Sequence, residues 1–160
     1  MESKLKKGDK IRDRILFGLL LVIIVGLPLG IWAVEQNAWP KDTPATAKRF
    51  TLSGNAYKGW ILGDVHGFDV VSFWKDRRPN SKPVLRVVKG DWVVLKLKSS
   101  DVVHGFSLKD FGVYIEDGIQ PGKTLYVSFM ADKTGTFTFS CNAICGELHE
   151  NMQGTLIVAA

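Results

Sequence analysis

Both cysteines of this 160-residue chain lie in one short segment, 141-CNAICGELHENM-152, together with one histidine and one methionine. Cys141 and Cys145 are followed by His149 and Met152 at short, nearly regular intervals. Thiolate and thioether sulfurs favour copper(I), and imidazole suits copper or zinc. The grouping of these four side chains therefore predicts a metal site, and their types favour copper with a redox role.

Three alternatives to copper each account for part of the segment. Two cysteines in an exported chain are often paired in a disulfide. A structural zinc ion is normally held by cysteine and histidine in a closed tetrahedron, and methionine is not a usual zinc ligand. Taken singly, Met152 would pack in a core and His149 would lie on the surface. Copper is favoured over these alternatives because it gives all four side chains a common role.

A complete copper site needs a second histidine, because the segment supplies only one. His104, 37 residues before Cys141, is the best candidate, whereas His66 has no assigned chemistry. A single blue-copper ion takes two histidines, one cysteine and a weakly bound methionine, so this set has one thiolate too many. Two cysteines can instead bridge two copper ions, and such a pair can share one electron.

Strands are predicted on both sides of the segment. Residues 135–140 read as a strand that enters it and residues 154–160 as a strand that leaves it. The spacing of the four side chains would also suit one face of a helix. A loop at the end of a β-sandwich is nevertheless favoured, because loops held by a rigid scaffold commonly carry function.

The rest of the chain after about residue 50 also has the pattern of a β-protein. Residues 84–98 predict a β-hairpin that turns at 89–91, and Asp117 with Gly118 predicts another turn. Residues 57–83 are the hardest to place. Further strands are predicted at 102–108, 113–115 and 125–131. Six or more short strands predict an all-β fold, a Greek-key sandwich of antiparallel strands.

The first part of the chain has a different composition. Residues 15–34 carry no charge and, as a helix, are long enough to cross the roughly 30 Å core of a bilayer. A cleaved secretory signal is the alternative, but it would have a shorter apolar region and a clear cleavage site. We therefore expect a basic cytoplasmic tail over 1–14, a transmembrane helix over 15–34, a linker over 35–49 and the β-domain over 50–160.

The net charge of +5 does not indicate a nucleic-acid partner, because the charges are unevenly distributed. Residues 1–14 carry six basic and three acidic groups, which places the N-terminus in the cytoplasm by the positive-inside rule. Residues 101–160 carry three basic and seven acidic groups. That acidic part could steer a basic partner towards the cysteines, and a solvated surface without a partner explains the charge equally well.

The pattern 101-DVVHGF-106 followed by 141-CNAICGELHENMQGTLIV-158 resembles the CuA domain of cytochrome c oxidase subunit II, which has a cupredoxin fold. The resemblance covers about residues 84–160. It implies two copper ions bridged by both cysteines, with a histidine on each ion and one methionine and one backbone carbonyl completing the set. The ligands it implies are His104, Cys141, the carbonyl of Ala143, Cys145, His149 and Met152.

The same resemblance implies a function. The chain would be a single-pass subunit in the plasma membrane, similar to the short subunit II of ba3-type oxidases, with its copper domain on the outer face. It would accept electrons from a cytochrome c and pass them to haem in subunit I, where oxygen is reduced. The acceptor could instead be a nitric or nitrous oxide reductase. A copper carrier for CuA assembly is a third hypothesis, but six ligands for two ions favour retention.

Two features differ from the family pattern. Many members have a glutamate at the position of Ala143 that helps to bind magnesium against subunit I, and alanine cannot do this. The aromatic-rich stretch near the electron-entry face of the family is not clearly present. We assign Trp60, Phe73 and Trp74 to core packing rather than to electron entry.

Overall fold

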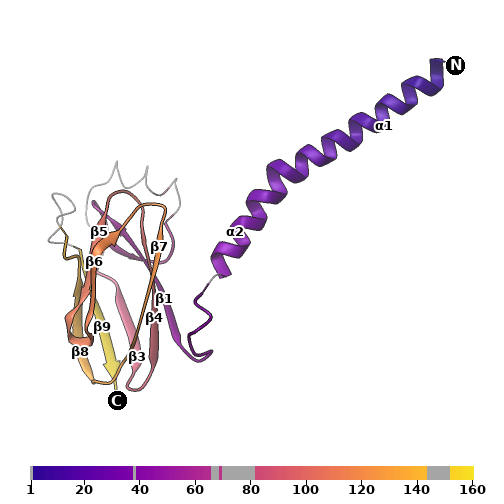
Figure 1. Cartoon of the computed structure of the whole chain (residues 1–160). Helices are drawn as coiled ribbons and strands as arrows, with labels where there is room; N and C mark the ends of the chain where they lie inside the picture. Colours follow the sequence, from indigo (N-terminus) through magenta and orange to yellow (C-terminus); the bar gives the residue numbers. More distant parts are fainter. Residues whose placement is uncertain (1, 38, 66–68, 70–81, 144–151) are drawn as a thin grey trace. The chain divides into compact units, whose positions relative to one another are not determined.

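The computed structural model describes residues 2–37, 39–65, 69, 82–143 and 152–160 of the chain. The chain forms two compact units, Met1–Lys41 and Asp42–Ala160. The first unit is helical and the second consists of β-strands (Figure 1).

The helical unit consists of α1 (Glu2–Leu21), a π-helical turn η1 (Val22–Gly26) and α2 (Leu27–Asn37). Pro28 follows the wide turn directly, and the N–H of Leu27 donates to the carbonyl of Val22. A proline ring clashes with the carbonyl four residues earlier in a regular α-helix, and a local π-turn relieves such conflicts.

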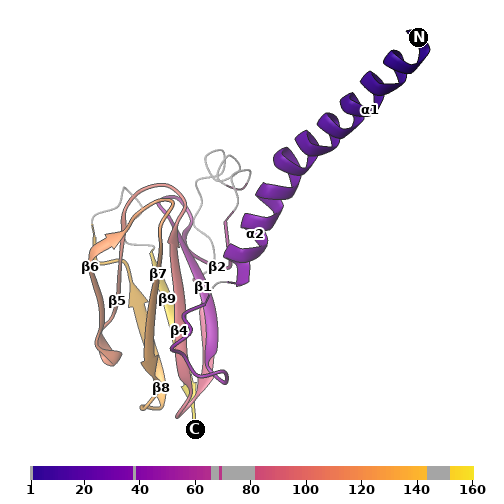
Figure 2. The same ribbon diagram turned by 45° about the vertical axis from the view of Figure 1, so that its right-hand side comes forward.

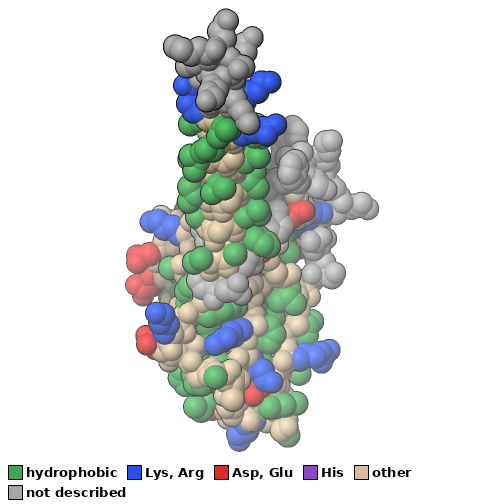
Figure 3. Space-filling model, turned by 90° about the vertical axis from the view of Figure 1, so that its right-hand side faces the viewer, with side chains coloured by type: hydrophobic (Ala, Val, Ile, Leu, Met, Phe, Trp, Pro, Cys, Tyr) green, Lys and Arg blue, Asp and Glu red, His purple; other side chains and the backbone are tan. Residues whose placement is uncertain are grey.

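Lys10–Val34 is long and apolar enough to cross a membrane. Apolar side chains cover this stretch, and basic side chains gather next to its N-terminal end (Figure 3). The helix continues through Asn37 and the first strand begins at Lys48, so the irregular part of the segment predicted as a linker is 39–47.

The β-unit contains nine strands among the described residues, more than the minimum predicted. The strands are β1 (Lys48–Asn55), β2 (Gly59–Leu62), β3 (Val84–Val88), β4 (Trp92–Ser99), β5 (His104–Leu108), β6 (Val113–Ile119), β7 (Thr124–Met130), β8 (Gly135–Ser140) and β9 (Gln153–Ala159). A short 3-10 helix η2 (Lys109–Phe111) joins β5 to β6.

The strands form two sheets, in the orders β2-β1-β4-β7 and β3-β9-β8-β5-β6. Apolar side chains from both sheets meet in one core that includes Leu52, Leu95, Phe106, Phe139 and Leu156. The predicted all-β sandwich is therefore confirmed, but its strands are not all antiparallel. β1 pairs with β4 in parallel, and so does β3 with β9; Figure 2 shows β1 and β4 side by side.

The predicted hairpin over 84–98 is wrong. β3 and β4 belong to different sheets, and the turn between them carries the chain across the core. Asp91 stabilises that turn by accepting a hydrogen bond from the N–H of Val88 at 2.9 Å, and Gly90 has a φ of 92°. A strand pair in one sheet and a crossing between two sheets require the same alternation of side chains, so periodicity could not separate them.

Two other expectations also need correction. Asp117 and Gly118 lie inside β6, where Gly118 has a φ of 72° next to an irregular pairing with β5, rather than in a turn. β1 lies largely in a stretch for which no strand was predicted. Of the difficult stretch 57–83, residues 59–62 form β2.

Gly154 in β9 offers a test of the packing between β8 and β9. A Cβ at this position would lie 2.2 Å from Cζ of Phe139, a fully buried ring. We expect Gly154→Ala to lower the free energy of unfolding by about 1–3 kcal/mol, because the ring has no space into which to move. Chemical denaturation would measure this, with Thr155→Ala on the same strand as control. Equal stabilities of the two variants would contradict the packing described here.

Candidate metal centre

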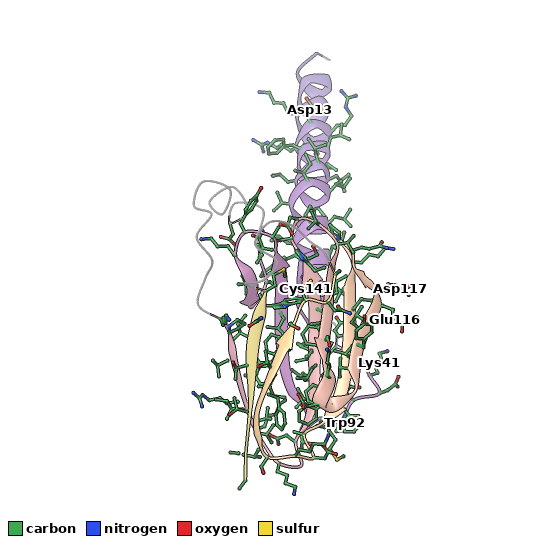
Figure 4. The ribbon with its side chains drawn as sticks, turned by 90° about the vertical axis from the view of Figure 1, so that its left-hand side faces the viewer. Asp13, Lys41, Trp92, Glu116, Asp117 and Cys141 are labelled. Carbon is green, nitrogen blue, oxygen red and sulfur yellow. The ribbon has the colours of Figure 1, made fainter. Side chains whose placement is uncertain are left out.

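Three neighbouring strands of the five-stranded sheet position the candidate site. The antiparallel register that sets Ser107 of β5 opposite Ser140 of β8 also brings the start of β5 towards the residues that follow β8. The N–H of Cys141 donates to the carbonyl of Met152 at 3.0 Å, which continues the β8–β9 pairing by one step. Cys141 lies near one end of the sandwich and Trp92 near the other (Figure 4).

Four of the six predicted ligands are described, and they come together at this end. The side chains of His104 and Met152 are 0% exposed and that of Cys141 is 7% exposed. The Sγ of Cys141 lies 3.3 Å from the carbonyl oxygen of Ala143 and accepts a hydrogen bond from the N–H of Gly105 at 3.2 Å. The other two predicted ligands, Cys145 and His149, lie outside the described residues.

His104 is held in one orientation by Asp101. The ring Nε2 lies 2.8 Å from Oδ1 of Asp101, and the buried Nδ1 makes no hydrogen bond of ordinary geometry with any described residue. A carboxylate on one ring nitrogen is the usual support of a metal-binding histidine, because it leaves the lone pair of the other nitrogen for the metal. His104 therefore has the burial that a ligand needs, and donation from Nε2 to Asp101 would leave Nδ1 to bind a metal.

The electrostatics of this pair follow from burial and hydrogen bonding together. Burial favours neutral His104 and so lowers its pKa, but the hydrogen bond to Asp101 and the nearby sulfur of Cys141 favour the protonated ring, and the net pKa is raised. Burial also raises the pKa of Asp101, while hydrogen bonds from His104 and from the N–H groups of Ala56 and Val102 lower it overall. Asp101 is thus kept as a carboxylate that accepts from the imidazole.

Asp101 belongs to a rigid turn that joins β4 to β5. Its Oδ2 accepts from the N–H of Ala56 at 2.7 Å, which links this turn to the one between β1 and β2. Ser100 strengthens the same link, because its Oγ donates to the carbonyl of Gly54 at 2.9 Å and accepts from Asn55 at 3.0 Å. Neither Asp101 nor these partners was predicted; the signal was an aspartate three residues before the candidate histidine.

The ring of His104 is packed on its other sides by Gly54 and Trp60. A Cβ at Gly54 would lie 2.7 Å from Cδ2 of the ring, so a side chain there would displace the imidazole. Trp60 lies 6.3 Å from His104 between ring centroids, and it packs edge-on against Phe106 at 5.5 Å. Trp60 is 1% exposed, which confirms its assignment to the core. Phe73, Trp74 and His66 lie outside the described residues.

The described donors suit copper better than a hard cation. A buried imidazole with an open lone pair, a thiol sulfur and a thioether are soft or borderline ligands. No group of three or more His, Cys, Asp and Glu side chains that could hold a metal occurs within the described ranges, from which Cys145 and His149 are missing.

Met152 allows the role of the thioether to be separated from packing. Leucine has a similar volume, so we expect Met152→Leu to change the free energy of unfolding by less than about 1.5 kcal/mol. A weak axial ligand tunes the potential more than it holds the metal, so copper should largely remain while the reduction potential shifts. Metal analysis and voltammetry would measure both. An unchanged potential would exclude Met152 as a ligand.

Known proteins resemble both the sequence and the fold. The sequence profile described as "Cytochrome C oxidase subunit II, periplasmic domain" matches residues 81–159. A cytochrome c oxidase subunit 2 of Thermus thermophilus is 33% identical over 124 residues, which cover 78% of this chain and 79% of that protein. A nitrous-oxide reductase of Cupriavidus necator is 37% identical over 79 residues, 47% of this chain but 12% of that protein.

A solved structure supports the fold. The periplasmic domain of subunit II of cytochrome oxidase (CoxB) of Bradyrhizobium japonicum superimposes with a TM-score of 0.50 at 22% identity, over 72% of this chain and 86% of that chain. The two-sheet sandwich, with its soft donor side chains at one end, defines a cupredoxin-like domain in a chain that also has an apolar helix. Together with the matched profile and the Thermus relative, it shows that the chain belongs to the cytochrome c oxidase subunit II family.

Membership in this family has direct consequences. The chain is part of an oxidoreductase complex, and its family implies assembly with other subunits in a membrane. The apolar helix Lys10–Val34 is consistent with such an anchor. The family also implies copper binding, which the donor types at the end of the sandwich suit.

Proposed function

We propose that this chain is the electron-entry subunit of a haem-copper terminal oxidase. It would accept electrons from a cytochrome c at a binuclear copper centre and pass them to haem in subunit I. One observation carries the proposal: a buried imidazole with an open Nδ1 lies at the same end of the sandwich as a buried thiol and a buried thioether.

The proposed ligands divide into two groups. His104, Cys141, Met152 and the carbonyl of Ala143 belong to the described residues, and the remaining two ligands, Cys145 and His149, are proposed from the sequence. Two copper ions held by this set would supply reversible one-electron chemistry. His104 would bind through Nδ1, because Nε2 is occupied by Asp101.

The protein contributes rigidity and exclusion of water. The buried His104 and Met152 are held at strand ends, so their positions should change little between redox states. Little rearrangement means a low barrier to electron transfer. The N–H of Gly105 stabilises negative charge on Cys141 Sγ and keeps that sulfur in place.

The proposed topology follows from charge. Basic residues before the anchor support a cytoplasmic N-terminus by the positive-inside rule, so the β-unit would lie on the outer side of the plasma membrane. The acidic balance of residues 101–160 suits a basic donor such as a cytochrome c. Oxygen reduction and proton pumping would belong to other subunits, because the span 15–34 has no ionisable residue.

A second acceptor is supported by a specific match. The nitrous-oxide reductase of Cupriavidus necator matches 79 residues of this chain, so the copper module could serve that reaction instead. The Thermus subunit matches 124 residues, a longer stretch, and this favours the oxidase. A copper carrier for assembly is least favoured, because buried ligands resist exchange.

The experiment that tests the proposal uses the full-length chain in detergent. Copper content and the electron paramagnetic resonance spectrum should show two copper ions per chain, with hyperfine coupling of one electron to both nuclei. A single copper coupled to one nucleus would refute the binuclear centre. An inert disulfide between Cys141 and Cys145 would refute copper binding altogether.

A further inference from the structure

We infer that Asn142, which lies against Gly105, is a positioning residue that fixes the corner of the copper site formed by residues 141–143. Asn142 is not one of the proposed ligands, but it stands between two of them, Cys141 and Ala143. The effect of Asn142 on bound copper rests on the proposed copper centre. Its effect on the position of residues 141–143 does not.

Gly105 provides the space for the Asn142 side chain. A Cβ at position 105 would lie 2.0 Å from Oδ1 of Asn142 and 2.8 Å from the backbone nitrogen of Ala143. Both distances are far below van der Waals contact, so any other residue at 105 would push the 142–143 segment away from β5. The absence of a side chain at 105 therefore allows Asn142 and Ala143 to approach the strand.

An irregularity in the pairing of β5 with β6 gives Gly105 a second function. The register between β5 and β6 shifts between His104 and Phe106, which leaves Gly105 without a Cα partner in β6. Its N–H donates instead to the Sγ of Cys141 at 3.2 Å. The bulge thus turns one backbone donor from the sheet towards the proposed copper ligand.

The amide of Asn142 ties this corner to the edge of the sheet. Nδ2 donates to the carbonyl of Ile115 in β6 at 3.3 Å. The buried Oδ1 has no hydrogen-bond partner among the described residues. A buried acceptor without a partner costs free energy, so stability alone does not explain an amide here. Its placement is explained if the side chain sets the position of its two neighbours.

Both neighbours of Asn142 carry proposed donor atoms, the Sγ of Cys141 and the carbonyl oxygen of Ala143. A single contact at Asn142 therefore fixes two ligands together. The hydrogen bond from the Gly105 N–H withdraws charge from the Cys141 sulfur and favours the more electron-rich, reduced copper centre. If the corner loosens, that bond should lengthen, so the reduction potential should fall and copper should leave faster.

The first test compares Asn142→Leu with Gln120→Leu in the full-length, copper-loaded chain. Leucine has the same number and branching of side-chain heavy atoms as asparagine but makes no hydrogen bonds, and Gln120 is an exposed amide just after β6. We expect Asn142→Leu to release copper to a chelator at least about tenfold faster, as other outer-shell changes weaken metal sites. Its potential should also be lower, while Gln120→Leu matches the wild type. Equal release rates and potentials in both variants would overturn the positioning role.

The second test asks whether Gly105 and Asn142 act through one contact. Gly105→Ala should displace the amide of Asn142, so adding Asn142→Leu should change the release rate less than the product of the single effects. Fully multiplicative effects would contradict a shared contact.

Hydrogen exchange of the copper-free chain provides a readout that is independent of metal. Asn142→Leu should speed exchange of the Cys141 amide, and Gln120→Leu should leave it unchanged. If the wild type failed to bind two coppers, the proposed function would fail, and this exchange rate would still decide the role of Asn142. Unchanged exchange in Asn142→Leu would overturn that role.

Discussion

Replacing Cys141 by serine should abolish the shared-electron signal of the copper centre. A serine hydroxyl is a hard, weakly acidic donor and cannot bridge two copper ions as a thiolate does. The change should also replace the sulfur that accepts from the Gly105 N–H at 3.2 Å by a hydroxyl oxygen on a shorter bond. We expect at most one copper per chain, with hyperfine coupling to a single nucleus and a loss of intensity in the sulfur-to-copper absorption bands.

Cys145→Ser is the matched variant for this prediction, because it removes the other proposed bridge. If both cysteines bridge, either substitution should convert the spectrum to that of a single copper. If only Cys141 is a ligand, Cys145→Ser should keep the wild-type spectrum, and the binuclear proposal would be wrong. The stability of each chain by thermal unfolding would control for misfolding, since serine is slightly smaller than cysteine.

Asp101→Ala should produce the second largest effect. The substitution removes the acceptor at 2.8 Å from Nε2 of His104 and leaves that buried ring nitrogen without a carboxylate partner. It also removes the acceptors of the N–H groups of Ala56 and Val102. We expect copper affinity to fall about 10–100-fold, because an outer-shell partner orients its ligand. The free energy of unfolding should fall by about 1–3 kcal/mol.

Asp101→Asn separates orientation of the ring from stability of the turn. An asparagine Oδ1 can still accept from His104, but its amide nitrogen would face the N–H of Ala56, which needs an acceptor. We therefore expect this variant to retain more copper affinity than Asp101→Ala while losing a comparable part of the stability. Competition with a copper chelator and chemical denaturation would measure the two quantities. Wild-type affinity in Asp101→Ala would show that His104 does not depend on Asp101, or is not a ligand.

The strand predictions show where reading the sequence succeeds. Alternation of side chains over 135–140 was sufficient to predict β8, because a strand with one buried face leaves that pattern. The same rule predicted strands at 84–88 and 92–98 but paired them with each other. Pairing depends on which strands lie on either side, and β3 takes β9 as its neighbour through contacts far apart in sequence.

In the candidate site too, the sequence predicts local features but not contacts between residues that are far apart in the chain. Residue types and spacing were sufficient to propose Cys141 and Met152 as ligands, because soft donors within a short segment are a local signal. His104 was proposed because a copper site needs a second histidine, which the segment lacks. The chain alone did not reveal that Gly105 donates to the Cys141 sulfur or that Asn142 rests on Gly105. Those contacts join residues 36 or more positions apart and arise only when β5 lies beside β8.

The sequence by itself determined the chemistry of this protein: an apolar helix of membrane length, a β-domain, and a set of donors suited to copper. These properties depend on the types of nearby residues, which remain the same in any fold. The tertiary structure decided how the donors are held. The burial of His104 against Gly54 depends on the packing of the two sheets, and the hydrogen bond from Gly105 to Cys141 depends on β5 lying beside β8. Only the tertiary structure brings these residues together, because they are far apart in the sequence.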